Sequence, residues 1–159
     1  MKRSIAALAL LLFCSFVAYG QAQKSTSAPP SEWTLSLKSG GAPWEKRFEV
    51  ELDQTGKLAL TENNSDKLPG DPVTKLNVNL PAGVVREIYE QAWLALREFR
   101  FPDKPDEMHD GTSLTLRLSA NGRVLTAFYH LGQTEEEAPE VARVLTLINK
   151  HLPEEHKVY

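Results

Sequence analysis

The chain has 159 residues, of which 42% are hydrophobic and 25% are charged, and its formal net charge at pH 7 is −3. This length suits a single domain that buries a continuous core. The slightly acidic balance of charges argues against nucleic acid and anionic lipid as partners, because both attract strongly basic surfaces.

Residues 1–20 have the pattern of a cleaved secretory signal peptide. A short basic segment precedes an uncharged apolar run from Ile5 to Val17, and the small residues Ala18 and Gly20 fit the positions that a signal peptidase reads. The run is shorter than the ~20 residues of a membrane-spanning helix. We therefore predict a secreted or periplasmic protein, cleaved after Gly20 or Ala22 and free of the membrane afterwards.

Cys14 is the single cysteine of the chain, and it lies inside the predicted signal. Phe13 before it fits a lipoprotein signal poorly, so a lipid anchor is not expected. Cleavage after Gly20 would leave 159 minus 20, or 139, residues without cysteine, which excludes disulfides and thiol catalysis. Loss of two basic residues with the signal would change the formal net charge from −3 to −5.

Alternating apolar and polar residues predict strands in the first half of the exported chain. Residues 21–32 are polar and contain several serines and prolines, which predicts a flexible linker before the first strand. From Trp33 onward, apolar residues recur at every second position, as in strands with one buried face. Strands are expected at 33–39, 46–53, 57–61 and 74–80.

Two segments have the periodicity of amphipathic helices. The first is expected at about 81–98 and should begin at Pro81, because proline fits the first helical position. The second is expected at about 138–151 and should end before Pro153. Its predicted apolar stripe consists of Val141, Val144, Leu145, Ile148 and Leu152.

Residues 112–131 predict a β-hairpin, because Asn121-Gly122 between two β-rich runs is a strong signal for a two-residue turn. Such a turn pairs Ala120 with Arg123, and this pairing determines which residues share a face. One face then holds Leu114, Leu116, Leu118, Leu125, Ala127 and Tyr129. The other face holds Thr115, Arg117, Thr126 and Phe128.

The order of these elements predicts an α+β fold. Helices with one apolar stripe and strands with one apolar face are best satisfied by a two-layer sandwich. We expect an antiparallel sheet of four to six strands with two helices packed on one face. Residues 33–153 are assigned to this single domain, and residues 154–159 to a C-terminal tail.

The stretch FPDKPDEMHDGT, residues 101–112, holds four acids and one histidine. It lacks the ligand spacing of a calcium-binding loop, and a zinc site would need more ligands than His109. A general base at His109, beside Asp106 and Asp110, would need a pocket and a nucleophile. We interpret the stretch as a polar connector, with a weak cation site or a catalytic site as alternatives. No metal, cofactor or catalytic residue is expected.

The candidate binding residues are Trp44, Phe128 and His130. Trp44 follows a turn between two predicted strands, where it either folds over the sheet edge or is exposed as an anchor for a partner. Phe128 lies on the polar face of the predicted hairpin. Either the tail around Val158 covers it, or it joins Val124 and His130 in an exposed apolar patch.

The chain resembles the emfourin-like family of small bacterial domains, which includes a protein inhibitor of thermolysin-type metalloproteases. The matching segments are LSLKSGG, RFEVELDQTGKL, AWLALREFRFPD and DGTSLTLRLSANGRV, followed by a leucine-rich helix, and together they span most of residues 33–152. The resemblance implies an α+β fold and a binding role. The chain differs from the family in its secretory signal and in a longer segment at 62–80.

These observations favour an exported, non-enzymatic module that binds another protein, of which a protease inhibitor would be one form. One alternative is an exported enzyme with a dispersed acid and histidine site near His109. Another is an envelope-associated structural protein. Neither the partner nor the oligomeric state follows from the sequence.

Overall fold

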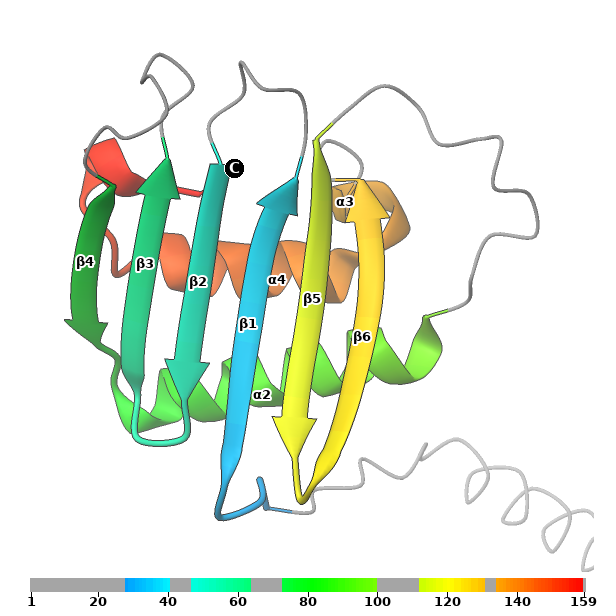
Figure 1. The fold of residues 1–159 in the computed structure, drawn as a ribbon. Coiled ribbons are helices and arrows are strands. Elements are labelled where there is room, and N and C mark those ends of the chain that lie inside the picture. Colours follow the sequence, from blue (N-terminus) through cyan, green and yellow to red (C-terminus); the bar gives the residue numbers. More distant parts are fainter. Residues whose placement is uncertain (1–27, 41–46, 64–72, 100–111, 131–133, 159) are drawn as a thin grey trace, which may run out of the picture.

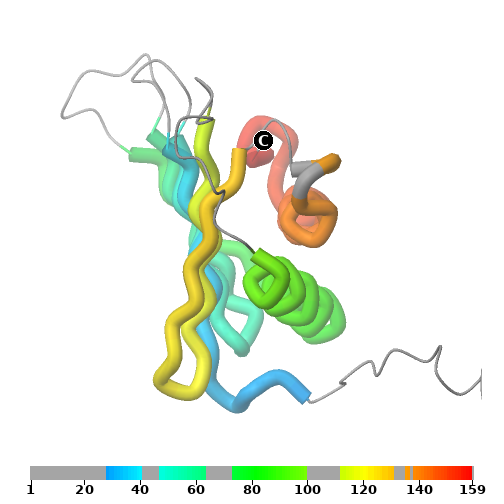
Figure 2. The backbone as a smooth tube through the Cα atoms, turned by 90° about the vertical axis from the view of Figure 1, so that its right-hand side faces the viewer, coloured from blue at the N-terminus to red at the C-terminus, as the bar shows by residue number. Residues whose placement is uncertain are grey.

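The computed structural model describes residues 28–40, 47–63, 73–99, 112–130 and 134–158. They form a six-stranded antiparallel sheet with helices on one face (Figures 1 and 2). The strands are β1 (Trp33–Gly40), β2 (Arg47–Asp53), β3 (Lys57–Asn63), β4 (Thr74–Asn79), β5 (Ser113–Ala120) and β6 (Arg123–His130). The helices are α2 (Ala82–Glu98), the short α3 (Thr134–Glu137), α4 (Pro139–Asn149) and the 3-10 helix η3 (Glu154–His156).

The order of strands across the sheet is β4-β3-β2-β1-β5-β6. The first four strands therefore form a meander, and the chain returns through α2 to place β5 beside β1. All neighbouring strands are antiparallel. The predicted fold class is confirmed, and so is the expectation that the helices pack on one face of the sheet.

The hairpin of β5 and β6 has the predicted register. Asn121 and Gly122 have φ values of 51° and 72°, as a type I′ turn requires at both central positions. Ala120 pairs with Arg123, and Leu116 pairs with Ala127. Because directly opposed residues share a face, Leu116 and Ala127 point to the core together, and each is fully buried.

The turn between β2 and β3 connects the meander to the start of α2. Gly56 has a φ of 89°, and an added Cβ would lie 2.6 Å from the carbonyl oxygen of Leu80. The Leu80 N–H donates to the Gly56 carbonyl at 2.8 Å. A glycine is needed here for both the left-handed backbone and the close approach. The helix then begins at Ala82, one residue after the predicted start, with extended Pro81 as its N-cap.

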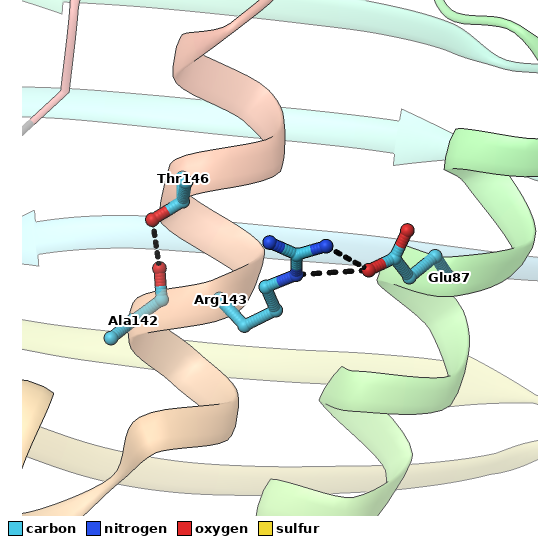
Figure 3. A network of polar contacts seen from close by, with 4 residues as sticks. All are labelled: Glu87, Ala142, Arg143 and Thr146. Carbon is cyan, nitrogen blue, oxygen red and sulfur yellow. Dashed lines mark hydrogen bonds and ion pairs between the residues drawn. The ribbon is translucent and has the colours of Figure 1, made fainter.

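The core lies between the inner face of the sheet and the paired helices α2 and α4 (Figure 2). The predicted apolar stripe of the last helix is confirmed, because all five of its residues are buried. Trp33 at the start of β1 packs against Tyr89 of α2, with ring centroids 5.1 Å apart. At the surface, the Arg143 guanidinium donates to Glu87 Oε1 through Nε at 2.9 Å and Nη2 at 2.6 Å, which links the two helices (Figure 3).

The C-terminal segment differs from the prediction of a tail. Residues 154–156 form η3, and Val158 is 1% exposed within the core. The Asn149 side chain accepts from the Val158 N–H at 2.8 Å and donates to the Val158 carbonyl at 2.7 Å. Because α4 ends at Asn149, before this segment, sequence periodicity contains no signal for the return. Residues 154–158 therefore belong to the domain.

Candidate functional site on the open face of the sheet

In the described part of the chain, no helix covers the second face of the sheet, which we call the outer face (Figure 2). The outer face consists of the alternate, mostly polar residues of each strand, whose side chains point away from the core. The pairing of the strands aligns these residues in rows that cross the sheet. The central row consists of Asn77, Ala59, Glu51, Ser36, Arg117 and Thr126.

A shallow hollow of about 530 Å³ lies at the centre of the outer face. Its acids come from β2, and its bases include Lys57 and Arg117. The Lys38 ammonium lies 3.8 Å from a carboxylate oxygen of Glu49, and both side chains are well exposed. An exposed pair of this kind contributes little to stability. The hollow is therefore polar and nearly balanced in charge, and it fits hydrogen bonding to a polar surface better than capture of one charged group.

Asp53, which lines this hollow, accepts the hydrogen bonds of a local turn. Its Oδ1 accepts from the Thr55 hydroxyl at 2.6 Å and from the backbone N–H groups of Thr55 and Lys57 at 2.8 and 3.1 Å. The Thr55 hydroxyl is the main reason that the pKa of Asp53 lies below its ordinary value, and slight burial opposes this shift. The ionised carboxylate therefore acts as a structural acceptor of the turn, and the arrangement does not resemble that of a general acid.

The apolar rim, by which we mean Val124 and Phe128, lies at the β6 edge of the outer face. Phe128 is 55% exposed and Val124 is 48% exposed. Val124 lies two residues before Thr126 and Phe128 two residues after it, so all three share one face. In β5, Ser119 pairs with Val124 and Thr115 pairs with Phe128. Because β6 is an edge strand of the sheet (Figure 1), the otherwise polar face ends in two large apolar side chains.

The structure places two of the three candidate binding residues together. Phe128 and His130 are two residues apart on the outer face of β6, and His130 is half-buried opposite Ser113. Trp44 lies outside the described residues. The expectation that the tail covers Phe128 is wrong, because Val158 packs in the core beside Asn149 and Phe128 remains exposed.

The predicted polar connector, with the alternative acid and histidine site near His109, Asp106 and Asp110, also lies outside the described residues. Among the residues that the structure describes, no three His, Cys, Asp or Glu side chains come together as metal ligands. Within the same residues, no helix is long and apolar enough to cross a bilayer.

Tyr129 anchors the edge strand to the helical layer from the inner side. Its hydroxyl donates to the Ala95 carbonyl of α2 at 3.2 Å, and its ring meets Phe99 edge to face with centroids 5.5 Å apart. Burial, with a smaller contribution from the charge of Glu140, raises the pKa of Tyr129 to about 12. The apolar rim is therefore displayed on a strand that the core holds in place.

Sequence reasoning missed a contact between a buried carboxylate and a histidine toward the other edge of the sheet. Glu62 is 4% exposed, and its Oε2 lies 2.7 Å from Nδ1 of His156 in η3. The alternation Leu58, Leu60, Glu62 points this carboxylate inward, so extending β3 by two residues would have revealed a buried acid that needs a partner. The pair joins η3 to β3, and this position is remote from the apolar rim (Figure 1).

Comparison with known proteins gives no family: no family model matches this chain, and no curated protein matches it in sequence. The resemblance to the emfourin-like family stays a prediction.

Proposed function

We propose that this protein is an exported, non-enzymatic module that binds another protein through the β6 side of its outer face. One observation carries the proposal: Val124 and Phe128 are two of the four most exposed large apolar side chains in the described residues, and they share one face of an edge strand. Exposed apolar residues that lie together mark contact sites more often than scattered ones do.

The chemistry of the surrounding surface supports binding. Thr126 and Thr115 lie beside the apolar rim, and the polar hollow lies on the same outer face. An apolar anchor here therefore has hydrogen-bonding groups near it. Protein interfaces commonly combine a buried aromatic anchor with a polar border. The half-buried His130 extends the same border at the end of β6.

The test is capture of partners from the extracytoplasmic fraction of the source organism by the immobilised protein. Phe128→Ala and Val124→Ala should each weaken capture while changing the free energy of unfolding by less than about 0.5 kcal/mol, because both side chains are exposed. Trp93→Ala is the matched control, since Trp93 is a 41% exposed aromatic on α2. Equal capture by the wild type and the Phe128→Ala variant would remove the functional claim for this surface.

The resemblance to the emfourin-like family makes a thermolysin-type metalloprotease the first defined partner to assay. Inhibition that saturates at one copy per protease, and that Phe128→Ala weakens but Trp93→Ala does not, would identify the module as an inhibitor acting through the rim. Proteolysis of the protein without inhibition would remove this form of the proposal and leave general protein binding to be tested by capture.

A further inference from the structure

The free edge of β6 has a defined pattern of backbone hydrogen-bonding groups. In a hairpin with a two-residue turn, the residues that flank the turn exchange both of their backbone hydrogen bonds. Ala120 and Arg123 flank this turn, so Arg123, Leu125, Ala127 and Tyr129 direct their N–H and C=O groups toward β5. The N–H and C=O groups of the residues between them, Val124, Thr126 and Phe128, point away from β5. In the described part of the chain, β6 pairs with β5 only.

The residues of β6 itself lack the sequence features that protect edge strands from pairing. Protected edges are short, or they carry lysine or proline. The other edge, β4, has six residues and includes Lys75 among its polar residues. β6 has eight residues, and no charged residue lies between Arg123 and His130 at its two ends. Its central sequence VLTAFY is typical of a strand inside a sheet.

We propose that β6 receives an extended segment of the partner protein as a seventh strand. This inference rests on the proposed function and specifies how the partner binds. Val124, Thr126 and Phe128 would exchange backbone hydrogen bonds with the segment, while the side chains of Val124 and Phe128 contact apolar residues at its alternate positions. Strand addition of this kind combines backbone affinity with side-chain selection.

The inner side of β6 favours one extended segment over a second domain. The last turn of α2 lies directly beneath β6, since the Ala95 carbonyl accepts from Tyr129 and Phe99 contacts the same ring. Helix α3 lies near the end of β6 (Figure 1). A single strand continues the plane of the sheet at a spacing of about 4.8 Å. A second copy joined through β6 would bring its own α2 against this helix end.

The charges near one end of β6 indicate the composition of a segment that pairs antiparallel to it. Glu135 and Glu136 of α3 are exposed, and Glu140 lies close enough to Tyr129 to influence its ionisation. Helix α3, which contains Glu135 and Glu136, lies near the end of β6 at which the strand finishes with His130 (Figure 1). An antiparallel seventh strand has its N-terminal end there. The segment is therefore uncharged in its centre, apolar at alternate positions, and basic at its N-terminal end.

A synthetic peptide tests the binding mode directly. The probe is a blocked peptide of alternating valine and threonine that starts with lysine, added to the exported protein at up to millimolar concentration and followed by amide chemical shifts. Saturable shifts should centre on Val124, Thr126 and Phe128. The same peptide with an N-methyl group on every residue cannot donate to the edge and should give no shifts. Replacing its lysine by glutamate should weaken binding. Absence of saturable shifts with the unmodified probe would overturn the inference.

Two variants at one position separate backbone pairing from side-chain contact. Thr126→Pro removes the outward N–H without touching the hydrogen bonds to β5, and proline is tolerated at such edge positions. It should weaken peptide binding by about tenfold, as expected when a hydrogen bond is lost and the edge is blocked sterically. Thr126→Ala keeps the N–H and should bind within about twofold of the wild type.

The natural partner distinguishes the two proposals. If Phe128→Ala weakens capture and Thr126→Pro does not, the rim binds a partner but strand addition is wrong. If neither variant weakens capture, the proposed function itself fails. Sedimentation of the protein alone tests for dimerisation through β6. A dimer that Thr126→Pro dissociates would show that a second copy pairs with this edge, and the inference of a partner segment would be wrong.

Discussion

Tyr129 connects the edge strand to α2 through its neutral hydroxyl, which makes this connection sensitive to alkaline pH. The pKa of Tyr129 is raised to about 12, above the ordinary value of about 10 in an unfolded chain. As the pH rises above 10, the unfolded chain loses this proton before the folded protein does. The stability that Tyr129 contributes is therefore fully present below pH 10 and decreases between pH 10 and about 12.

We predict that Tyr129→Phe costs about 1 kcal/mol of unfolding free energy at neutral pH, because the hydrogen bond to the Ala95 carbonyl is lost. The difference between variant and wild type should shrink at about pH 11, where ionisation of the unfolded wild-type chain favours unfolding. Urea titrations of both proteins at the two pH values measure it. Tyr89, whose pKa burial also raises, is present in both proteins and cancels. A difference that does not change with pH would contradict the assignment.

Single residues differ in how well the sequence predicts them. The exposure of Phe128 follows from the two-residue turn, because hairpin register places it opposite Thr115 on the polar face. The alternation of β3 points Glu62 inward, but the partner of this buried carboxylate does not follow from local pattern. Its partner His156 is 94 residues away in sequence, and only the docking of η3 brings the two together.

At the scale of elements, the hairpin of β5 and β6 is the part whose register can be tested most directly. Leu116 is fully buried opposite Ala127, and its neighbour Arg117 is exposed opposite Thr126. We predict that Leu116→Ala destabilises the protein by about 2–4 kcal/mol through lost burial and a residual cavity. Leu118→Ala should cost a similar amount for the same reason.

Arg117→Ala is the matched control, and it should change the free energy of unfolding by no more than about 0.5 kcal/mol. Chemical denaturation of the three variants measures all of these effects. If Arg117→Ala were the costliest of the three, the pairing would be displaced by one residue, since such a shift exchanges the two faces of a strand.

The elements themselves were predictable where one physical signal dominates. Period-two alternation located β1, β2 and β5, and the amphipathic stripe located α2 and α4, because each buries a single face. The end of β3 was placed two residues early, since Glu62 at an inward position breaks the apolar pattern. The order of strands did not follow from the sequence, because the pairing of β5 with β1 depends on contacts about 80 residues apart.

The candidate site follows from the arrangement of the whole molecule. No single motif identifies it, since the apolar rim becomes a surface feature only because β6 ends the sheet and the C-terminal segment packs elsewhere. A sequence reading could propose Phe128 but could not decide whether residues 154–159 cover it. The structure decides this point, because η3 lies beside β3 at the opposite side of the sheet (Figure 1).

Because the C-terminal segment packs against the core, it should contribute to the free energy of unfolding of the whole domain. Val158 is buried, both of its backbone groups are bonded to Asn149, and His156 lies against the buried Glu62 carboxylate. We predict that deleting residues 154–159 lowers the free energy of unfolding by about 3 kcal/mol or more. Burial of the Val158 side chain and the partner of a buried acid are both lost.

One single variant tests the buried side chain of this segment, a second variant is its exposed control, and thermal unfolding measures both. Val158→Ala should cost about 1–2.5 kcal/mol for the methyl groups removed from the core. Glu155→Ala, at an exposed position of η3, should be nearly neutral. A truncated protein that melts like the wild type would show that the segment is dispensable.

The truncated protein should still bind partners through the apolar rim, because β6 and Tyr129 make their contacts with β5 and α2. Binding that disappears while the remaining domain stays folded would place part of the site on the C-terminal segment.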